Sequence, residues 1–238
     1  MTARLFGVLN ACLLLIAFST NVHAALATAG VTFDWSTFDT ATTGDLVATM
    51  VGPMGDSYDA CAQGAPCSTG STDGFGGLTV LLTGPTSHAS VWSTTDVIGA
   101  SVGAAPGFGG ATFERFFSFE ALSGSGNLSL SVDVEIQAEV QGAGTFADSE
   151  ALFGYEIGNS GVVASLAGLE MSGNSGDQSQ TLPTTLAFSV FMQDGDVIDM
   201  FAEGGAEVSS VVPIPAAAWM FGSGLLGLVG IARRKKAA

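Results

Sequence analysis

The stretch Leu128–Gln141, "LSLSVDVEIQAEVQ", decides the fold class of this chain. Every even-numbered position from Leu128 to Val140 is apolar, and every odd-numbered position from Ser129 to Gln141 is polar. Fourteen residues of unbroken period two fit a strand with one buried face, and they do not fit an amphipathic helix. We therefore expect one long antiparallel strand here, bent or bulged near its middle.

Shorter β-prone runs surround this stretch and are separated by segments rich in Gly, Ser and Pro. They lie at 31–35, 45–51, 77–84, 90–98, 111–122, 151–157 and 161–171. In "TTLAFSVFMQDGDVIDMF", Asp194-Gly195 stands between two further runs and predicts a hairpin. About nine or ten strands with turns between them predict an all-β fold over residues 25–210, an antiparallel β-sandwich or jelly roll.

Charge is divided unevenly along the chain. All 22 carboxylates lie between Asp34 and Glu207, and Arg115 is the one cation among them. The other five cations lie close to the two ends of the chain. Such an anionic middle region repels phosphate backbones, which argues against nucleic-acid binding and favours cations or neutral partners.

The first 24 residues are typical of a secretory signal peptide. Arg4 precedes a short apolar run at 11–18, and a polar stretch then ends in Val22-His23-Ala24. The apolar run is too short to span a membrane, so we expect cleavage by signal peptidase after Ala24. A buried N-terminal helix is the alternative.

Export to an oxidising compartment gives the cysteines a simple interpretation. Cys12 leaves with the signal peptide, and Cys61 and Cys67 remain in "CAQGAPC". Two cysteines this close in an exported chain predict a disulfide that closes a surface loop.

The C-terminal segment, residues 211–238, predicts a single membrane span followed by a basic tail. Residues 213–232 carry no charge and are largely apolar, and 20 helical residues cover about 30 Å, the thickness of a hydrocarbon core. The cluster Arg233, Arg234, Lys235 and Lys236 places this end on the cytoplasmic side, so the middle region lies outside.

The same segment resembles the C-terminal sorting signal of bacterial PEP-CTERM proteins, in its VPLPA-type variant. The match covers Val212 to Lys236, with the proline motif at Val212, Pro213, Ile214, Pro215 and Ala216. Ile214 departs from the variant's leucine, and the Pro-Glu-Pro form itself is absent. The resemblance implies recognition by an exosortase, cleavage near the motif, and delivery to the cell surface or extracellular matrix of a Gram-negative bacterium with exopolysaccharide and biofilm functions. A permanent single-span anchor is the alternative.

Candidate ligand sites in the middle region are few. Asp194 and Asp196, with Asp199 nearby, could offer oxygen ligands to calcium, as could Asp56 and Asp59, but neither group has the EF-hand spacing. Asp-Gly is also ordinary turn chemistry, and we expect no other cofactor.

Aromatic rings and the isolated arginine are the remaining candidates. Trp92 could present a flat ring to a sugar, whereas Trp35 is expected in the core. Arg115 shares a strand face with Phe113 and Phe117, where it either anchors an acidic ligand or neutralises an inward-facing carboxylate.

No catalytic residue is predicted. His88 is expected in a loop and no G-x-S-x-G motif accompanies it. A pair of carboxylates for glycoside hydrolysis is a matter of spatial arrangement that the spacing does not select. The leading expectation is a non-enzymatic, exported protein of the cell surface or matrix, structural or associated with exopolysaccharide. A carbohydrate-binding module or adhesin, with or without calcium, comes second, and a secreted hydrolase third.

Overall fold

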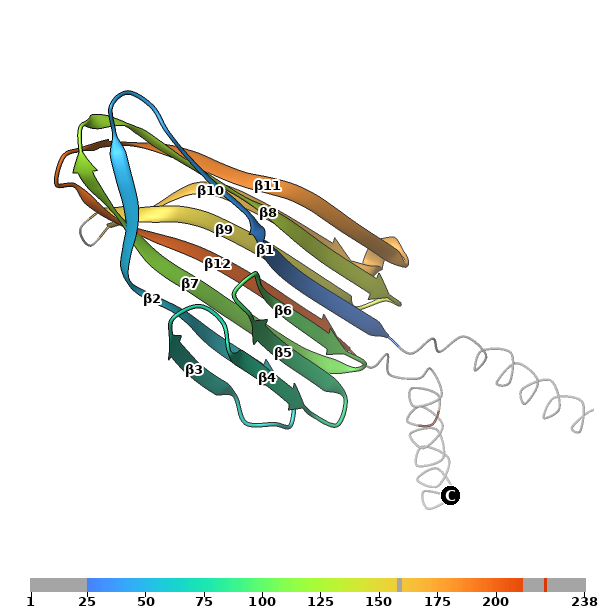
Figure 1. Cartoon of the computed structure of the whole chain (residues 1–238). Coiled ribbons are helices and arrows are strands. Elements are labelled where there is room, and N and C mark those ends of the chain that lie inside the picture. The colour runs from blue at the N-terminus through green and yellow to red at the C-terminus, as the bar shows by residue number, and fades with distance from the viewer. Residues whose placement is uncertain (1–24, 158–159, 212–220, 222–238) are drawn as a thin grey trace, which may run out of the picture. The chain divides into compact units, whose positions relative to one another are not determined.

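Two six-stranded antiparallel sheets, packed face to face, make up the described part of the chain (Figure 1). The structure is a computed structural model that describes residues 25–157, 160–211 and 221. Residues 25–211 form one compact unit. The strands are β1 Leu26–Thr42, β2 Val47–Ala62, β3 Ser68–Asp73, β4 Leu78–Thr83, β5 Ser87–Ser93, β6 Val97–Ala104, β7 Gly107–Ser123, β8 Ser125–Gln141, β9 Thr145–Ile157, β10 Ser160–Ser172, β11 Gln178–Gln193 and β12 Val197–Ser210, with one short 3-10 helix at Gly173–Ser175. The predicted all-β sandwich is confirmed.

The chain crosses repeatedly between the two sheets. Sheet A has the order β11-β8-β1-β6-β5-β4, and sheet B has the order β10-β9-β12-β7-β2-β3. Strands β4, β5 and β6 form a meander, and β9 and β10 form a hairpin within one sheet. Most of the other connections lead from one sheet to the other, so residues from distant parts of the sequence meet in the core.

Strand β8 lies inside sheet A, where the period-two stretch predicts a half-buried strand. Its even-numbered residues are buried against sheet B, and its polar residues face outward. The expected bulge is not in β8 itself. It lies in its partner β1, where the register shifts between Asp34 and Asp39. Within this irregular stretch the Thr37 hydroxyl oxygen accepts a hydrogen bond from the Asp133 N–H of β8 at 2.9 Å.

The predicted hairpin at Asp194-Gly195 is wrong. The turn exists, with Gly195 at φ +83° and the Asp196 N–H bonded to the Gln193 carbonyl. It connects β11 of sheet A to β12 of sheet B, so the two flanking strands pair with β8 and β7 rather than with each other. A tight Asp-Gly turn can connect two strands of different sheets as well as two neighbouring strands of one sheet.

The core changes in character along the sandwich. Toward one end the inner faces carry alanines such as Ala27, Ala138 and Ala206. There the Ser149 hydroxyl reaches from sheet B to sheet A, accepting from the Gly30 N–H at 3.1 Å and donating to the Gln137 carbonyl at 2.7 Å. Toward the other end large rings fill the space, namely Phe33, Trp35, Phe113, Phe117 and Phe153. The prediction that Trp35 lies in the core is confirmed.

Two predicted segments fall outside the described residues: the signal peptide at 1–24 and the C-terminal segment from 212 onward, with its sorting motif, membrane span and basic cluster. Within the residues that the structure describes, no helix is long and apolar enough to cross a membrane.

Candidate functional site

The outer face of sheet B carries a hollow of about 360 Å³ over the middle strands. Its floor includes Gly110 of β7 and Gly205 of β12, whose missing side chains leave the space open. A methyl group at either position would meet no atom closer than 3.6 Å, so these glycines are not required by close packing. The hollow therefore follows from the absence of two outward side chains on neighbouring strands.

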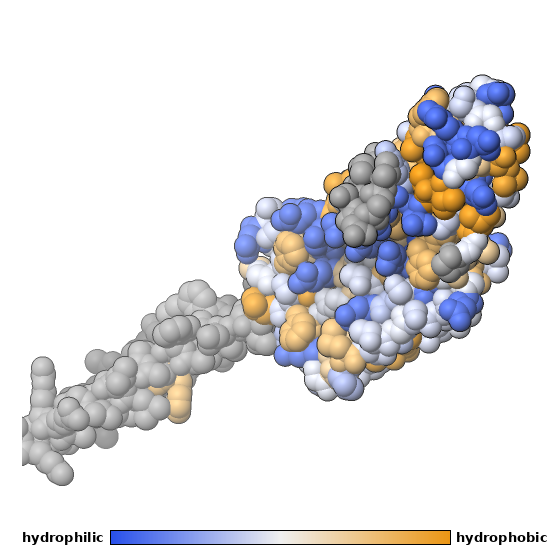
Figure 2. Space-filling model, turned by 90° about the vertical axis from the view of Figure 1, so that its left-hand side faces the viewer, coloured by the Kyte–Doolittle hydropathy of each residue, from blue (hydrophilic) through white to orange (hydrophobic). Residues whose placement is uncertain are grey.

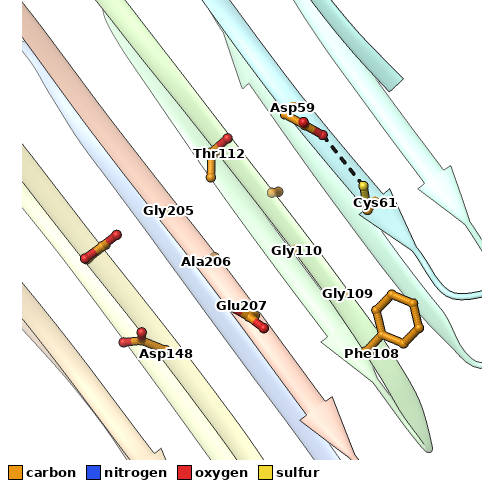
Figure 3. A pocket seen from close by; sticks show the side chains of 12 residues that line it. Asp59, Cys61, Phe108, Gly109, Gly110, Thr112, Asp148, Gly205, Ala206 and Glu207 are labelled. Atoms are coloured by element: carbon orange, nitrogen blue, oxygen red, sulfur yellow. Dashed lines mark hydrogen bonds between the residues drawn. The ribbon is translucent and has the colours of Figure 1, made fainter. Parts of the chain in front are cut away.

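Carboxylates flank this hollow from three strands. Asp59 of β2 lies on one side, and Asp148 of β9 and Glu207 of β12 lie on the other, as Figure 3 shows. Glu150 of β9 also lines it, and the exposed ring of Phe108 lies at one end. Carboxylates and an exposed ring are groups that bind a polyol, because carboxylates accept hydroxyl hydrogens and a ring covers an apolar sugar face.

One carboxyl beside the hollow is perturbed by partial burial and, to a smaller extent, by neighbouring negative charge. Glu203 of β12 lies directly opposite Glu114 of β7 in the sheet. Partial burial raises the pKa of Glu203, and the negative charges of Glu114 and Glu150 raise it further. This face therefore favours protons, cations or hydrogen-bond donors over anions.

The sequence pattern does not reveal this group of residues. Asp59, Asp148, Glu150 and Glu207 become neighbours only through the register of β2, β7, β12 and β9. The one sequence signal is weak: glycine recurs at outward positions of strands that otherwise alternate well, at Gly110 and Gly205.

Trp92 lies on the outer face of the other sheet, on β5. Its ring covers the backbone of Gly99 on β6, where an added Cβ would lie only 2.6 Å from the indole. His88, four positions along the same strand, covers Gly103 in the same way. His88 was expected in a loop, but it belongs to this strand. Both rings lie on one strand face, about 13 Å apart at about 3.3 Å per residue.

Arg115 is fully buried and forms an ion pair with Asp56. Its Nε donates to Asp56 Oδ1 at 2.7 Å, and its Nη2 donates to Asp56 Oδ2 at 2.9 Å. The guanidinium carbon lies 4.5 Å from the ring centre of Phe75 and 5.1 Å from that of Trp35. This geometry matches the structural alternative for Arg115, a charge that neutralises an inward carboxylate.

The same ion pair connects the two sheets. Arg115 donates to the carbonyls of Thr94 at 2.8 Å and Thr95 at 3.2 Å, which belong to the β5–β6 turn of sheet A. The Ser93 hydroxyl donates to Asp56. The pair thus joins β2 and β7 of sheet B to the end of β5 in sheet A.

The two groups of aspartates that could bind calcium occupy different surroundings in the structure. Asp56 faces the core and Asp59 faces solvent, so the expected proximity of these two carboxylates is wrong. Asp194 and Asp196 are exposed in the β11–β12 turn, and the Asp196 carboxylate accepts the Gln193 N–H at 2.7 Å. Asp199 lies further along β12, where Ser118 donates to it at 2.6 Å. Among the described residues, no group of three or more His, Cys, Asp or Glu side chains is arranged to hold a metal ion.

Cys61 and Cys67 form a disulfide that closes the loop after β2. Cys61 Sγ also lies 3.7 Å from Asp59 Oδ1, beside the hollow (Figure 3), although a disulfide sulfur has no proton to donate. The disulfide indicates an oxidising, extracytoplasmic location.

Several apolar side chains are exposed at one end of the sandwich. Val47, Leu122, Phe191 and Val197 lie near the turns of β2, β7, β11 and β12. Figure 2 faces this end and shows hydrophobic surface between hydrophilic groups. These side chains come from both sheets, and we assign them no ligand.

Comparison of the chain with protein-family models, with curated proteins and with solved structures found no match.

Proposed function

We propose that this chain is a non-enzymatic, exported β-sandwich protein that acts at the cell surface or in the extracellular matrix. The observation that carries the export is the Cys61–Cys67 disulfide, because structural disulfides form and persist in oxidising compartments and are rare in the cytosol. The distribution of charge along the chain agrees with this location. The sandwich region is anionic, and five of the six Lys and Arg residues lie in the segments before and after it.

The sorting step of the proposal rests on the resemblance of Val212–Lys236 to the VPLPA-type signal. An exosortase would read Pro213 and Pro215, which hold the chain extended because proline fixes φ and removes amide donors. The segment after the motif would serve as a transient membrane helix, with Arg233–Lys236 on the cytoplasmic side. Signal peptidase would remove residues 1–24.

The processing step is tested by replacing both prolines. In the native host, the Pro213→Ala/Pro215→Ala double variant is expected to remain in the inner-membrane fraction at its uncleaved length, while the unaltered protein reaches the surface fraction. A matched control, Pro106→Ala in the β6–β7 turn, leaves the motif intact and should be sorted normally. Equal surface delivery of the double variant would contradict the sorting model.

A second candidate function is the binding of a neutral polysaccharide, and the position of Trp92 favours it. The indole lies over Gly99 of the neighbouring strand, where an added Cβ would come within 2.6 Å of the ring, so the backbone of β6 covers part of the indole while the rest remains on the outer face of the sheet. Residues 74–113, which include β4, β5 and β6, contain one charged residue, Asp96. A flat ring on an uncharged surface rich in Ser and Thr suits the apolar face of a sugar.

Affinity electrophoresis through gels that contain soluble polysaccharides tests this binding. Trp92→Ala is expected to abolish retardation by a neutral glucan, because the stacking surface is lost. Phe191→Ala removes an exposed ring on β11, the opposite edge strand of sheet A, and should leave retardation unchanged. Chelation of calcium is expected to have no effect, because the described residues offer no group of three metal ligands. Retardation of Trp92→Ala equal to that of the unaltered protein would remove this candidate.

A further inference from the structure

The sandwich has four edge strands, and three of them carry features that discourage pairing with another chain. Edge strand β11 contains Pro183, which lacks an N–H. The ladder of β10 is interrupted by a register shift between Val163 and Ser165. Strand β3, "STGSTD", has no large apolar residue and ends in Asp73. Proline, bulges, polar composition and charge are the usual protection of a sheet edge.

The fourth edge strand, β4, has none of these features. Its sequence "LTVLLT" contains no proline, glycine or charge. Its ladder with β5 runs from Leu78 to Thr83 without a register shift. The outward side chain of Leu81 is 66% exposed, and the inward Val80 and Leu82 are only partly buried. An uninterrupted apolar edge of this kind is a template for another strand.

The distribution of charge indicates which chain supplies the strand that pairs with β4. Two copies of this chain repel each other over most of their surface, because one cation stands against 22 carboxylates in the middle region. Strands β4, β5 and β6 are the exception, since Asp96 in the β5–β6 turn is the one charge among residues 74–113. Two copies therefore approach each other with least repulsion along β4.

The hydrogen-bonding pattern fixes which groups face the free edge. The Gly84 N–H bonds to the Ser87 carbonyl at 2.8 Å, so Gly84 and Ser87 form a hydrogen-bonded pair at the β4–β5 turn. Such pairs alternate along an antiparallel ladder. The even-numbered residues of β4 therefore bond to β5, and Thr79, Leu81 and Thr83 point their N–H and C=O groups away from it.

We propose that two copies of this chain pair antiparallel through β4, with Leu81 opposite Leu81 and Thr79 opposite Thr83 of the second copy. All three outward N–H groups and all three outward carbonyls of each copy are then satisfied. The two Leu81 side chains lie on the same face of the joined sheet and cover each other. The six strands of each sheet A become one continuous sheet.

This pairing closes at two copies. The same edge is used by both partners around a two-fold axis, so no second β4 edge is left to add a third copy. The joined face carries Trp92 and His88 from both copies on one surface, because residues opposite each other in an antiparallel pair point to the same side.

Sedimentation velocity of residues 25–211 over a range of concentrations tests the proposal; these residues contain every described strand and the entire described core. The unaltered protein is expected to approach twice the monomer mass as its concentration rises. Leu81→Lys places two ammonium groups opposite each other and is expected to weaken dimerisation at least tenfold. Leu166→Lys is the matched control, since Leu166 is 62% exposed on the edge strand β10, and it should dimerise like the unaltered protein. A monomer at every concentration, equal dimerisation of Leu81→Lys, or growth beyond two copies would overturn the proposal.

Thiol cross-linking provides a second measurement that keeps the apolar edge. Cys61 and Cys67 are joined, so Leu81→Cys adds the only free thiol in residues 25–211. Opposed residues in a hydrogen-bonded pair have Cα atoms about 5.5 Å apart, within reach of a short bifunctional thiol reagent. Leu81→Cys is expected to give a covalent dimer and Leu166→Cys to stay monomeric. Equal cross-linking of both variants would contradict the assigned register.

Discussion

Arg115 shows how one charged residue is accommodated inside an apolar core. It is the only cation between residues 5 and 232, and both it and its partner Asp56 are fully buried. Taking two charges out of water is costly, and here the cost is offset because carbonyls, a hydroxyl and two rings complete the coordination. Nothing in the spacing of the sequence points to Asp56 as the partner.

Removal of one member of this pair should therefore be severe. Asp56→Ala leaves a buried, uncompensated guanidinium and is expected to lower the free energy of unfolding by about 3–5 kcal/mol. The double variant Asp56→Leu/Arg115→Met removes both charges and should recover most of that loss. Urea denaturation measures both. A double variant no more stable than Asp56→Ala would show that the charge itself is not the cause.

Glu203 makes the stability depend on pH in a defined direction. Its pKa in the folded state is raised above 4.5, so between the two values the folded protein binds more protons than the unfolded chain. The free energy of unfolding contributed by this group therefore falls as the pH rises through that interval.

Glu203→Gln is thus expected to stabilise the protein at pH 7 and to lose that advantage below about pH 4, where the carboxyl is protonated in both states. Thermal unfolding at the two pH values measures the difference. The same gain at both pH values would mean that charge crowding on this face is not responsible.

At the scale of elements, the turn between β11 and β12 decides how the chain passes from one sheet to the other. Gly195 has φ +83° and lies in open space, so a side chain there meets a conformational penalty but no clash. Gly195→Ala is expected to lower the free energy of unfolding by about 1 kcal/mol.

Gly168 provides the control for this change, because an added Cβ there meets only ordinary contact at 3.8 Å and the backbone is not left-handed. Gly168→Ala is expected to change stability by less than about 0.5 kcal/mol. Equal losses for the two variants in urea denaturation would contradict the assignment of strain to the turn.

The sequence predicts individual strands well and their partners poorly. Period two fixes β8 and its buried face, because each side chain's direction follows from its position alone. The run 90–98 instead divides into β5 and β6, since the turn at Thr94 and Thr95 contains no glycine or proline. Strand β3 has no large apolar residue and was not predicted.

The candidate site depends on pairing, which local pattern does not encode. Asp59, Asp148 and Glu207 meet at the hollow only because β2, β7, β12 and β9 are adjacent. The turn at Asp194-Gly195 was placed correctly, but its sequence does not indicate that the next strand, β12, belongs to the other sheet. The disulfide was predictable, since Gly64 and Pro66 favour a turn between Cys61 and Cys67, which are six positions apart.

At the scale of the whole molecule, we propose an anionic sandwich that is exported from the cytoplasm and that lies between two apolar ends carrying the other five cations. The disulfide gives this view a direct consequence for stability. Reduction, or the double variant Cys61→Ser/Cys67→Ser, opens a short loop and is expected to lower the free energy of unfolding by about 2 kcal/mol. An unchanged urea midpoint on reduction would mean that the disulfide has no role in holding the fold.

Intact-mass spectrometry of the protein recovered from its native host tests the central claim, export with processing at both ends. We predict a surface-associated chain that begins at Ala25, ends near the Pro213–Pro215 motif, and is two mass units lighter than its reduced form because of the disulfide. A full-length, reduced chain of 238 residues recovered from the cytosol would contradict it.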